Sequence, residues 1–183
     1  MKNRNKPMFF AGLAAFAAGL AILGYFGYQK ITRELRMKKL LEENVVLEIP
    51  ALKIRVPVQE GTDPEILSVS AGHFPDTGAV GSGNYCIAGH NSTIYAEVFN
   101  DLDQIKTGDK MYLIDSGPNQ TQYVYTVTEY HIVQPNQVEV LNDFGDDRLT
   151  VISCTDDGQA RQVVVGILEQ QETDQSKNAL DGT

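Results

Sequence analysis

Apolar residues divide the chain into two unlike parts. Residues 8–28 carry no charged side chain, and a run of about twenty apolar residues has the length that a helix needs to cross a bilayer. The run continues well past the small residues at which a cleavable secretory leader would be cut. We therefore expect an uncleaved transmembrane anchor over residues 8–29, preceded by a cytoplasmic stub of residues 1–7.

The pattern changes twice after this anchor. Residues 30–45 have a helix-forming composition with a loose apolar stripe, which indicates a juxtamembrane stalk. From Val45 onward, short β-branched and aromatic runs alternate with turn signals, and seven or eight such runs indicate a closed β-barrel or a sandwich over residues 46–170. The polar residues 171–183 are expected to form a disordered tail. The expected strands are Val45–Ile49, Leu52–Val58, Asn84–Ala88, Lys110–Ile114, Tyr123–Val133, Leu149–Cys154 and Arg161–Leu168, and the expected short helices are Asp63–Ser70, capped by Thr62 or Asp63, and Ala96–Leu102.

Charge follows the same division of the chain. Eight of the 15 Lys and Arg residues lie before residue 40, whereas only one of the 24 Asp and Glu residues does, so the remainder carries seven positive and 23 negative residues, a net charge of −16. Such a domain is repelled by nucleic acid and by anionic lipid, which excludes a nucleic-acid-binding function. Basic residues flank the anchor on both sides, so the positive-inside rule does not settle its orientation. The short stub and the large following domain fit an N-inside, C-outside arrangement.

Cys86 and Cys154 are the two cysteines of the chain. A small exported domain that depends on disulfides usually carries more, so we read Cys86 as a buried core residue and expect no disulfide. Cys154 ends a strand-like run and Arg161 begins the next one, with an Asp157-Gly158 hairpin signal between them. If these two residues form the turn, 156 pairs with 159, 155 with 160, and Cys154 with Arg161. A thiol beside a fixed positive charge favours the thiolate, which is the nucleophilic form.

His90 follows the strand-like run Asn84–Ala88 and a bend that Gly89 permits. Together with Cys154 and Arg161, it completes a set of nucleophile, proton carrier and oxyanion stabiliser. These residues resemble the sortase family, membrane-anchored cysteine transpeptidases of Gram-positive bacteria. The family's N-x-x-I-A-G-H segment is matched by Asn84 to His90, its T-L-x-T-C segment by Thr150-Val151-Ile152-Ser153-Cys154, and its arginine by Arg161 in R-x-V-V-V-G. Val151 and Ser153 stand where the family usually has leucine and threonine.

The resemblance implies a mainly β fold, the sortase-type eight-stranded closed β-barrel with short helices, here preceded by one transmembrane helix. It also implies that Cys154 forms an acyl-thioester with an LPXTG-like C-terminal sorting signal of a secreted protein. His90 would donate and accept protons, and Arg161 would stabilise the oxyanion or the substrate. The acceptor would be an amine from a cell-wall precursor or a pilin lysine. The chain would reside in the plasma membrane of a Gram-positive bacterium, with its catalytic domain outside the cytoplasm.

Further residues are candidates for substrate binding or for metal binding. Asn91, Ser153 and His73 are candidate substrate contacts, although His73 lies in a loop-like Gly-His-Phe-Pro segment for which we favour a structural role. We expect no cofactor and no metal site; calcium held by Asp101 and Asp103, or by Asp143, Asp146 and Asp147, is the alternative, because some sortases bind it.

Several other functions remain open at this point. Pilin-polymerising sortases often carry an Asp-Pro-aromatic lid, whereas Asp63-Pro64-Glu65 lacks the aromatic residue, so we favour a housekeeping or class D-like sortase over a pilin polymerase. An L,D-transpeptidase places its cysteine after Ser-His-Gly, which Ile152-Ser153-Cys154 does not match, and a papain-like peptidase needs a cysteine opening a long helix. A non-enzymatic, membrane-tethered β-domain is the alternative of another class. In such a scaffold Cys154 would react slowly with thiol reagents.

Overall fold

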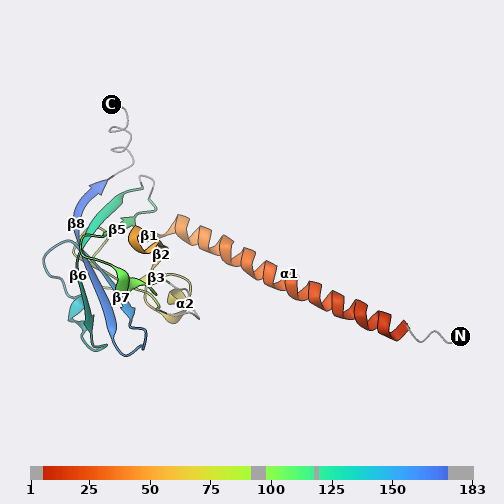
Figure 1. Cartoon of the computed structure of the whole chain (residues 1–183). Coiled ribbons are helices and arrows are strands. Elements are labelled where there is room, and N and C mark those ends of the chain that lie inside the picture. Colours follow the sequence, from red (N-terminus) through yellow and green to blue (C-terminus); the bar gives the residue numbers. More distant parts are fainter. Residues whose placement is uncertain (1–5, 92–97, 118–119, 173–183) are drawn as a thin grey trace. The chain divides into compact units, whose positions relative to one another are not determined.

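The computed structural model describes residues 6–91, 98–117 and 120–172, and it contains one long helix and a closed β-barrel (Figure 1). The helix and the barrel domain are separate compact units. In chain order the elements are α1 (Lys6–Glu43), β1 (Val45–Ile49), η1 (Pro50–Leu52), β2 (Ile54–Glu60), α2 (Pro64–Leu67), β3 (Ala71–His73), β4 (Asn84–Ala88), η2 (Leu102–Gln104), β5 (Lys110–Ile114), β6 (Gln122–Val133), η3 (Val138–Leu141), β7 (Arg148–Cys154) and β8 (Arg161–Glu172), where η marks a short 3-10 turn.

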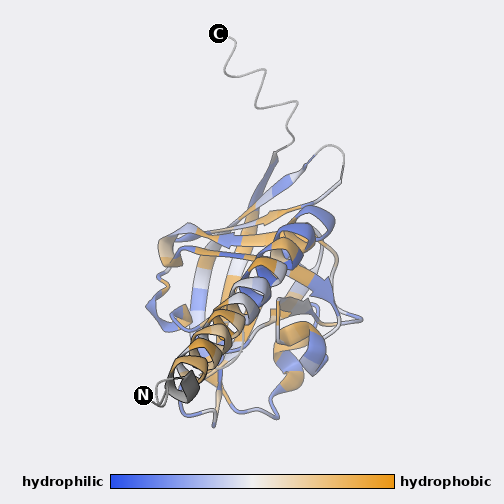
Figure 2. Cartoon of the chain, turned by 90° about the vertical axis from the view of Figure 1, so that its right-hand side faces the viewer, coloured by the Kyte–Doolittle hydropathy of each residue, from blue (hydrophilic) through white to orange (hydrophobic). Residues whose placement is uncertain are grey.

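Helix α1 contains both the expected anchor and most of the expected stalk. In the described residues it is the one helix that is long and apolar enough to cross a membrane, judged by length and composition. Its N-terminal half is apolar on every side, and polar residues become frequent toward its C-terminal end (Figure 2). A helix that is hydrophobic all round needs an apolar environment, which lipid supplies. Because α1 runs without a break to Glu43, the expected stalk is a continuation of the anchor helix, and β1 begins two residues after α1 ends.

The eight strands close into a barrel in the order β1-β2-β3-β4-β7-β8-β6-β5, with β5 paired back to β1. Two neighbouring pairs, β2·β3 and β4·β7, are parallel, and the others are antiparallel. The closed eight-stranded barrel predicted from the resemblance is thus confirmed. Closure pairs every barrel strand in the described residues with two neighbours, although the later part of β6 extends beyond its pairing with β5.

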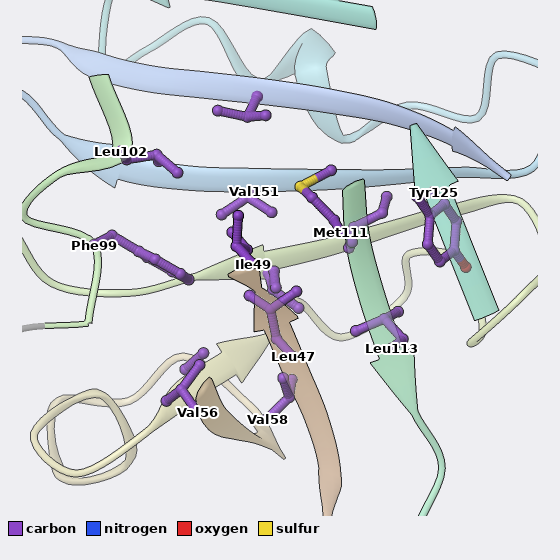
Figure 3. Packing of buried hydrophobic residues seen from close by; sticks show 14 of the residues in the cluster. Leu47, Ile49, Val56, Val58, Phe99, Leu102, Met111, Leu113, Tyr125 and Val151 are labelled. Carbon is purple, nitrogen blue, oxygen red and sulfur yellow. The ribbon is translucent and has the colours of Figure 1, made fainter. Parts of the chain in front are cut away.

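Alternate side chains of the strands fill the barrel with one apolar core (Figure 3). Leu47, Ile49, Met111, Leu113 and Tyr125 are fully buried there. Segments between strands also contribute, because the rings and branches of Phe99 and Leu102 pack into one end of this core. Each large buried side chain contributes roughly 1.5–3 kcal/mol to the free energy of folding by leaving water. The core therefore stabilises the strands whose ends carry the candidate site.

A second, smaller apolar cluster covers the outer face of β7 and β8. Ile152, Val163 and Val165 form its buried part, and they alternate along their strands with the residues that face the main core. The connection between β6 and β7 packs over this outer face through Val140 and Leu141 of η3. The outer face of β7 and β8 is therefore apolar at Ile152, Val163 and Val165, next to the strand ends that carry Cys154 and Arg161.

The structure differs from the predicted elements in several places. Strand β2 is Ile54–Glu60 and not Leu52–Val58, and helix α2 covers only Pro64–Leu67 of the predicted Asp63–Ser70. Strand β3 was not predicted, because three residues between a serine and a Phe-Pro pair carry no readable period. The helix predicted over Ala96–Leu102 is wrong for its described part, since residues 98–101 form turns and a 3-10 turn follows; residues 96 and 97 lie outside the described residues. Asp63 does begin α2, but its side chain makes no capping hydrogen bond. Strand β8 continues to Glu172 because its last residues pair with the start of β6, and residues 173–183 of the predicted tail lie outside the described residues.

Candidate active site

Strand directions bring the three predicted catalytic positions to one end of the barrel. β4 and β7 are parallel neighbours, so the segment after β4 and the end of β7 lie at the same edge. β8 is antiparallel to β7, so its first residue lies there too. His90, Cys154 and Arg161 occupy these three strand ends, which places the side chains that the sequence predicted to act together at a common edge of the sheet.

Cys154 and Arg161 form a cross-strand pair, as the hairpin register predicted. The next backbone bond, from Thr155 N–H to Ala160 O at 3.1 Å, shows that residues 155 and 160 form the hydrogen-bonded pair. Pairs alternate in an antiparallel ladder, so Cys154 and Arg161 form a non-hydrogen-bonded pair, the kind in which side chains lie closest, with Cα atoms about 4.5 Å apart. The thiol and the base of the guanidinium side chain therefore project from the same face as direct neighbours.

The turn between these strands differs from the predicted two-residue turn. Gly158 N–H bonds to Thr155 O at 2.8 Å, so Asp156 and Asp157 occupy the turn, and Gly158 follows with a φ of 70°. Asp157 keeps a negative φ, and its carboxylate accepts hydrogen bonds from Thr155 Oγ1 at 2.6 Å and Gln159 N–H at 3.0 Å. These two bonds favour a type I turn closed by a left-handed glycine, which replaces the predicted 156–159 pair with a four-residue loop.

Both side chains of the pair are half-buried on the outer face of the barrel. Cys154 lies two residues beyond Ile152, and Arg161 two residues before Val163, so the pair borders the outer apolar cluster. Arg161 Nη1 donates to Ala160 O at 3.0 Å and to Gly158 O at 3.5 Å, which holds the guanidinium along the hairpin. The result is a thiol, a permanent positive charge and an apolar surface beside one another.

His90 is positioned by two backbone bonds and by one ring. Gly89 N–H bonds to Ile152 O at 3.1 Å, which joins the segment before His90 to the strand of Cys154. His90 O accepts a bond from Phe99 N–H at 3.2 Å, and the Phe99 ring lies against Gly89 so closely that a Cβ on residue 89 would overlap it. Gly89 is therefore required for close approach of an aromatic ring, rather than for the bend that the sequence suggested.

Two of the predicted substrate contacts are placed in the interior. Ser153 is 2% exposed and points to the opposite face from Cys154, where its hydroxyl donates to Gly89 O at 3.0 Å. Neighbouring residues of a strand face opposite sides, so a substrate contact from Ser153 does not fit this geometry. Its bond instead joins the two strands that carry His90 and Cys154.

His73 also has internal partners. Its Nδ1 lies 2.7 Å from Glu60 Oε2, its Nε2 lies 3.0 Å from Thr77 Oγ1, and its ring stacks on Tyr85 at 4.2 Å between centroids. The residue is 8% exposed and belongs to β3, not to a loop as expected. These contacts fit the structural role that the sequence favoured for His73.

Asn91, the third predicted substrate contact, lies at the site itself. Its side-chain amide donates to the backbone oxygen of Cys154 at 3.1 Å and to Asp156 Oδ1 at 2.8 Å. Its two hydrogen bonds join the segment that carries His90 to the end of β7 and to the hairpin loop.

Both cysteines are free thiols, in agreement with the predicted absence of a disulfide, and their environments differ. Cys86 is completely buried, and this burial raises the pKa of its thiol to about 11, although hydrogen bonds with Thr150 and Thr77 act in the opposite direction. At neutral pH Cys86 is an uncharged core residue, as predicted. Cys154, which is half-buried at the strand end, is the accessible thiol.

Four of the five acidic residues considered for calcium have other partners in the structure. Asp146 pairs with the Arg148 guanidinium, Asp147 accepts from Gly83 N–H at 2.9 Å, and Asp143 accepts from Gly145 N–H at 2.8 Å. Asp101 accepts from the Gln104 amide at 2.7 Å. Within the described ranges, no group of three or more His, Cys, Asp or Glu side chains is arranged to hold a metal ion.

Asn84 has a role that sequence reasoning did not assign. It is 2% exposed, and its amide donates to Val140 O at 3.0 Å and to Asn142 O at 2.8 Å, while its oxygen accepts from Thr150 Oγ1 at 2.6 Å. These bonds attach the β6–β7 connection to the start of β4. The only signal in the sequence was its place at the beginning of the His90 segment.

The fold and the arrangement of these residues agree with comparisons to known proteins. A family model described as "Sortase domain" matches residues 47–169. Sortase A of Bacillus anthracis is 36% identical over 124 residues, which cover 67% of this chain and 58% of that protein, and sortase A of Listeria monocytogenes is 32% identical over 128 residues, which cover 69% and 56%. The chain thus spans little more than half the length of these curated relatives.

Solved structures give the same result. A crystal structure of Listeria monocytogenes sortase A has a TM-score of 0.65 and 31% identity, with 70% of this chain and 88% of that chain covered. The structure of a mutant sortase E from Streptomyces avermitilis has a TM-score of 0.65 and 28% identity, with 74% and 93% covered. The family-model match over residues 47–169 includes the strands that end in Cys154 and begin with Arg161. This chain belongs to the sortase family.

Proposed function

We propose that this chain is a cysteine transpeptidase that cleaves an LPXTG-like C-terminal sorting signal of a secreted protein and transfers that protein to an amine of the cell wall. The observation that carries the proposal is the direct pairing of Cys154 with Arg161, beside a His90 segment that is bonded to the strand of Cys154. Membership of the sortase family supports the reaction class.

In the first half of the proposed reaction, the Cys154 thiolate attacks the carbonyl carbon of the signal's Thr–Gly bond. The carbonyl electron pair moves onto oxygen, and the Arg161 guanidinium stabilises the oxyanion, a task suited to a charge that is never lost. The carbonyl then re-forms and the C–N bond breaks, while protonated His90 gives its proton to the leaving glycine amine. The products are an acyl-thioester on Cys154 and a free C-terminal fragment.

In the second half, an incoming amine attacks the thioester. His90, now neutral, removes a proton from this amine, the C–S bond breaks, and the thiolate leaves with its electron pair. The new amide is released, and both catalytic groups return to their starting protonation states. Division of one acyl transfer into two steps allows the same thiol and histidine to serve both halves.

The apolar cluster beside Cys154 supports a hydrophobic recognition step. Ile152 and Val163 continue the faces of Cys154 and Arg161, and η3 covers them through Val140 and Leu141. Because Ile152 and Val163 are already buried, the apolar leucine and proline of an LPXTG-like signal would pack against the partly exposed members of the cluster, such as Phe74, Val140 and Leu141. Each apolar side chain that leaves water contributes roughly 1–3 kcal/mol, enough to select such a signal from polar peptides.

The proposed setting is the outer surface of a Gram-positive plasma membrane. Helix α1 supports this by its length and composition. We propose a cytoplasmic N-terminal stub and an extracytoplasmic barrel, because the secreted protein and the cell-wall amine lie outside. A housekeeping or class D-like role is favoured over pilin polymerisation, since Asp63 and Pro64 begin the short helix α2 inside the barrel domain instead of a lid.

The test uses the full-length chain in detergent, with a library of LPXTG-like and NPQTN-like peptides and a short amine acceptor. The wild type should release the C-terminal fragment, form the transfer product, and carry the acyl group on Cys154 by mass spectrometry. Cys154→Ala should do none of these, whereas Cys86→Ala should retain the activity. Cleavage that survives in Cys154→Ala would overturn the mechanism. A wild type that cleaves nothing and whose Cys154 reacts slowly would favour the scaffold.

A further inference from the structure

The backbone carbonyl of Cys154 lies where the ladder between β4 and β7 would continue. Gly89 N–H bonds to Ile152 O, and in a parallel ladder the next acceptor along β7 is the oxygen of Cys154, two residues on. The side-chain amide of Asn91 occupies this place, at 3.1 Å from that oxygen. His90 is therefore bracketed by two bonds to β7, one from the residue before it and one from the residue after it.

A second amide reaches the same oxygen from the barrel interior. Gln162 follows Arg161 on β8, is 3% exposed, and its Nε2 donates to Cys154 O at 2.9 Å. The Tyr130 hydroxyl donates to Gln162 Oε1 at 3.2 Å, which fixes the end of the amide that faces Cys154. Burial, with the carboxylates of Asp103 and Asp156, raises the pKa of Tyr130, so this hydroxyl stays protonated as a donor.

We propose that Asn91 and Gln162 are positioning residues for the nucleophile: their two side-chain amides hold the Cys154 carbonyl and thereby set the Cys154 side chain relative to His90 and Arg161. A carbonyl oxygen has two lone pairs, and the two amides approach it from separate parts of the chain, Asn91 from the segment after β4 and Gln162 from β8. With this peptide plane fixed, the Cα–Cβ bond of Cys154 has one direction. Asn91 also donates to Asp156 Oδ1, so the two hydrogens of its amide are engaged within the protein.

This inference rests on the proposed function for its catalytic consequence. Reacting groups misplaced by about 1 Å lose roughly 10²-fold in rate, so a device that fixes the thiol relative to the histidine acts on the chemical step. A residue that binds the peptide acts on KM instead. The two roles of Asn91, positioning residue or substrate contact, therefore predict opposite kinetic changes.

The kinetic test compares Asn91→Ala and Gln162→Met with a matched control in the full-length protein. Each variant should lower kcat roughly 10- to 100-fold with KM within about twofold. The double variant should lose more than the product of the single losses, because each amide alone still holds the carbonyl. The control is Gln59→Ala, which removes a part-buried amide that donates to Ser70 Oγ at 2.7 Å, away from Cys154. This variant should keep the wild-type kcat even if its melting temperature falls.

A second measurement needs no substrate. Hydrogen–deuterium exchange of peptides covering residues 152–163 should accelerate in Asn91→Ala and in Gln162→Met, and stay unchanged in Gln59→Ala. If the wild type cleaves no sorting peptide, the proposed function fails while this exchange result still tests the hold on Cys154. A raised KM with an unchanged kcat in Asn91→Ala, or exchange equal to the wild type, overturns the inference.

Discussion

Cys154 and Arg161 oppose each other on β7 and β8 in a pair whose backbone groups point away from one another, so their side chains share the closest spacing that the sheet offers. Only six residues separate them in the chain, and the loop between them is fixed by its own bonds from Thr155, Asp157 and Gly158. The positive charge is therefore tied to the thiol through one short, rigid hairpin.

Substitution of Arg161 should reduce the chemical step. Arg161→Gln removes the permanent charge and should lower kcat by about 10²–10³, the usual loss when one oxyanion donor is removed. Arg161→Lys keeps a charge without the planar fork and should fall between this variant and the wild type. Initial rates with a sorting peptide measure both variants. Arg55→Gln, which removes a surface ion pair with Glu48 on the β1–β2 hairpin, is the control and should stay within about twofold of the wild type. Equal losses in the two glutamine variants would contradict the assigned role.

The buried thiol of Cys86 predicts a loss of stability at alkaline pH. Burial raises its pKa from 9.0 to about 11, so the unfolded chain releases this proton first as the pH rises. The stabilising contribution is complete below about pH 9 and is lost as the pH approaches and passes 11; a difference of two units corresponds to about 3 kcal/mol. Tyr125, whose pKa burial raises to about 12, adds to the same trend at higher pH.

Chemical denaturation of the full-length protein in detergent, between neutral pH and about pH 10.5, measures this loss. Cys86→Ala should be less stable at neutral pH because a buried group is removed, yet its free energy of unfolding should fall less steeply above about pH 9. Parallel pH curves for the two proteins would show that Cys86 does not titrate on unfolding. Iodoacetamide at about pH 8 should modify Cys154 and leave Cys86 of the folded protein unmodified.

Gly89→Ala should disturb the catalytic histidine through a neighbour. The added Cβ overlaps the Phe99 ring, and Phe99 N–H is bonded to His90 O, so relief of the overlap moves the backbone that carries His90. We expect kcat to fall roughly 10- to 100-fold, with a lower melting temperature. Gly117→Ala is the control, because its Cβ meets only the Asp115 side chain at 3.3 Å and more. A second substitution, Phe99→Leu, should restore part of the activity of Gly89→Ala; if it restores none, the overlap is not the cause.

The sequence predicted the features of this site that depend on neighbours in the chain. The Asp157-Gly158 pair set the register of Cys154 against Arg161, although the same pair also suits the type I turn with a left-handed glycine that the structure adopts. The sequence did not show why Gly89 is needed, because the ring of Phe99 reaches it from ten residues away. Nor did it show that the amides of Asn91 and Gln162 donate to the backbone oxygen of Cys154, because these residues become neighbours only when the chain is folded. Asn91 and Ser153 were predicted to contact substrate because each is next to a catalytic residue in the sequence. Successive residues of a strand face opposite sides, so Ser153 faces away from the side that carries Cys154.

Asn84 provides the last prediction, which concerns the wall of the outer apolar surface. Its amide holds the backbone oxygens of Val140 and Asn142, and η3 covers the apolar cluster next to Cys154. Asn84→Ala removes the buried amide that makes these part-buried bonds and should lower the free energy of unfolding by about 1–3 kcal/mol. Because the connection loses its attachment to β4, KM for a sorting peptide should rise several-fold, while the Cys154–Arg161 pair and kcat stay nearly unchanged. Thr150→Val removes the hydroxyl that bonds to Asn84 Oδ1 and to the Cys86 thiol but keeps the Asn84 amide on the connection, so it should destabilise the barrel and leave KM near the wild-type value. If both variants raise KM equally, general loss of stability and not the release of η3 explains the effect.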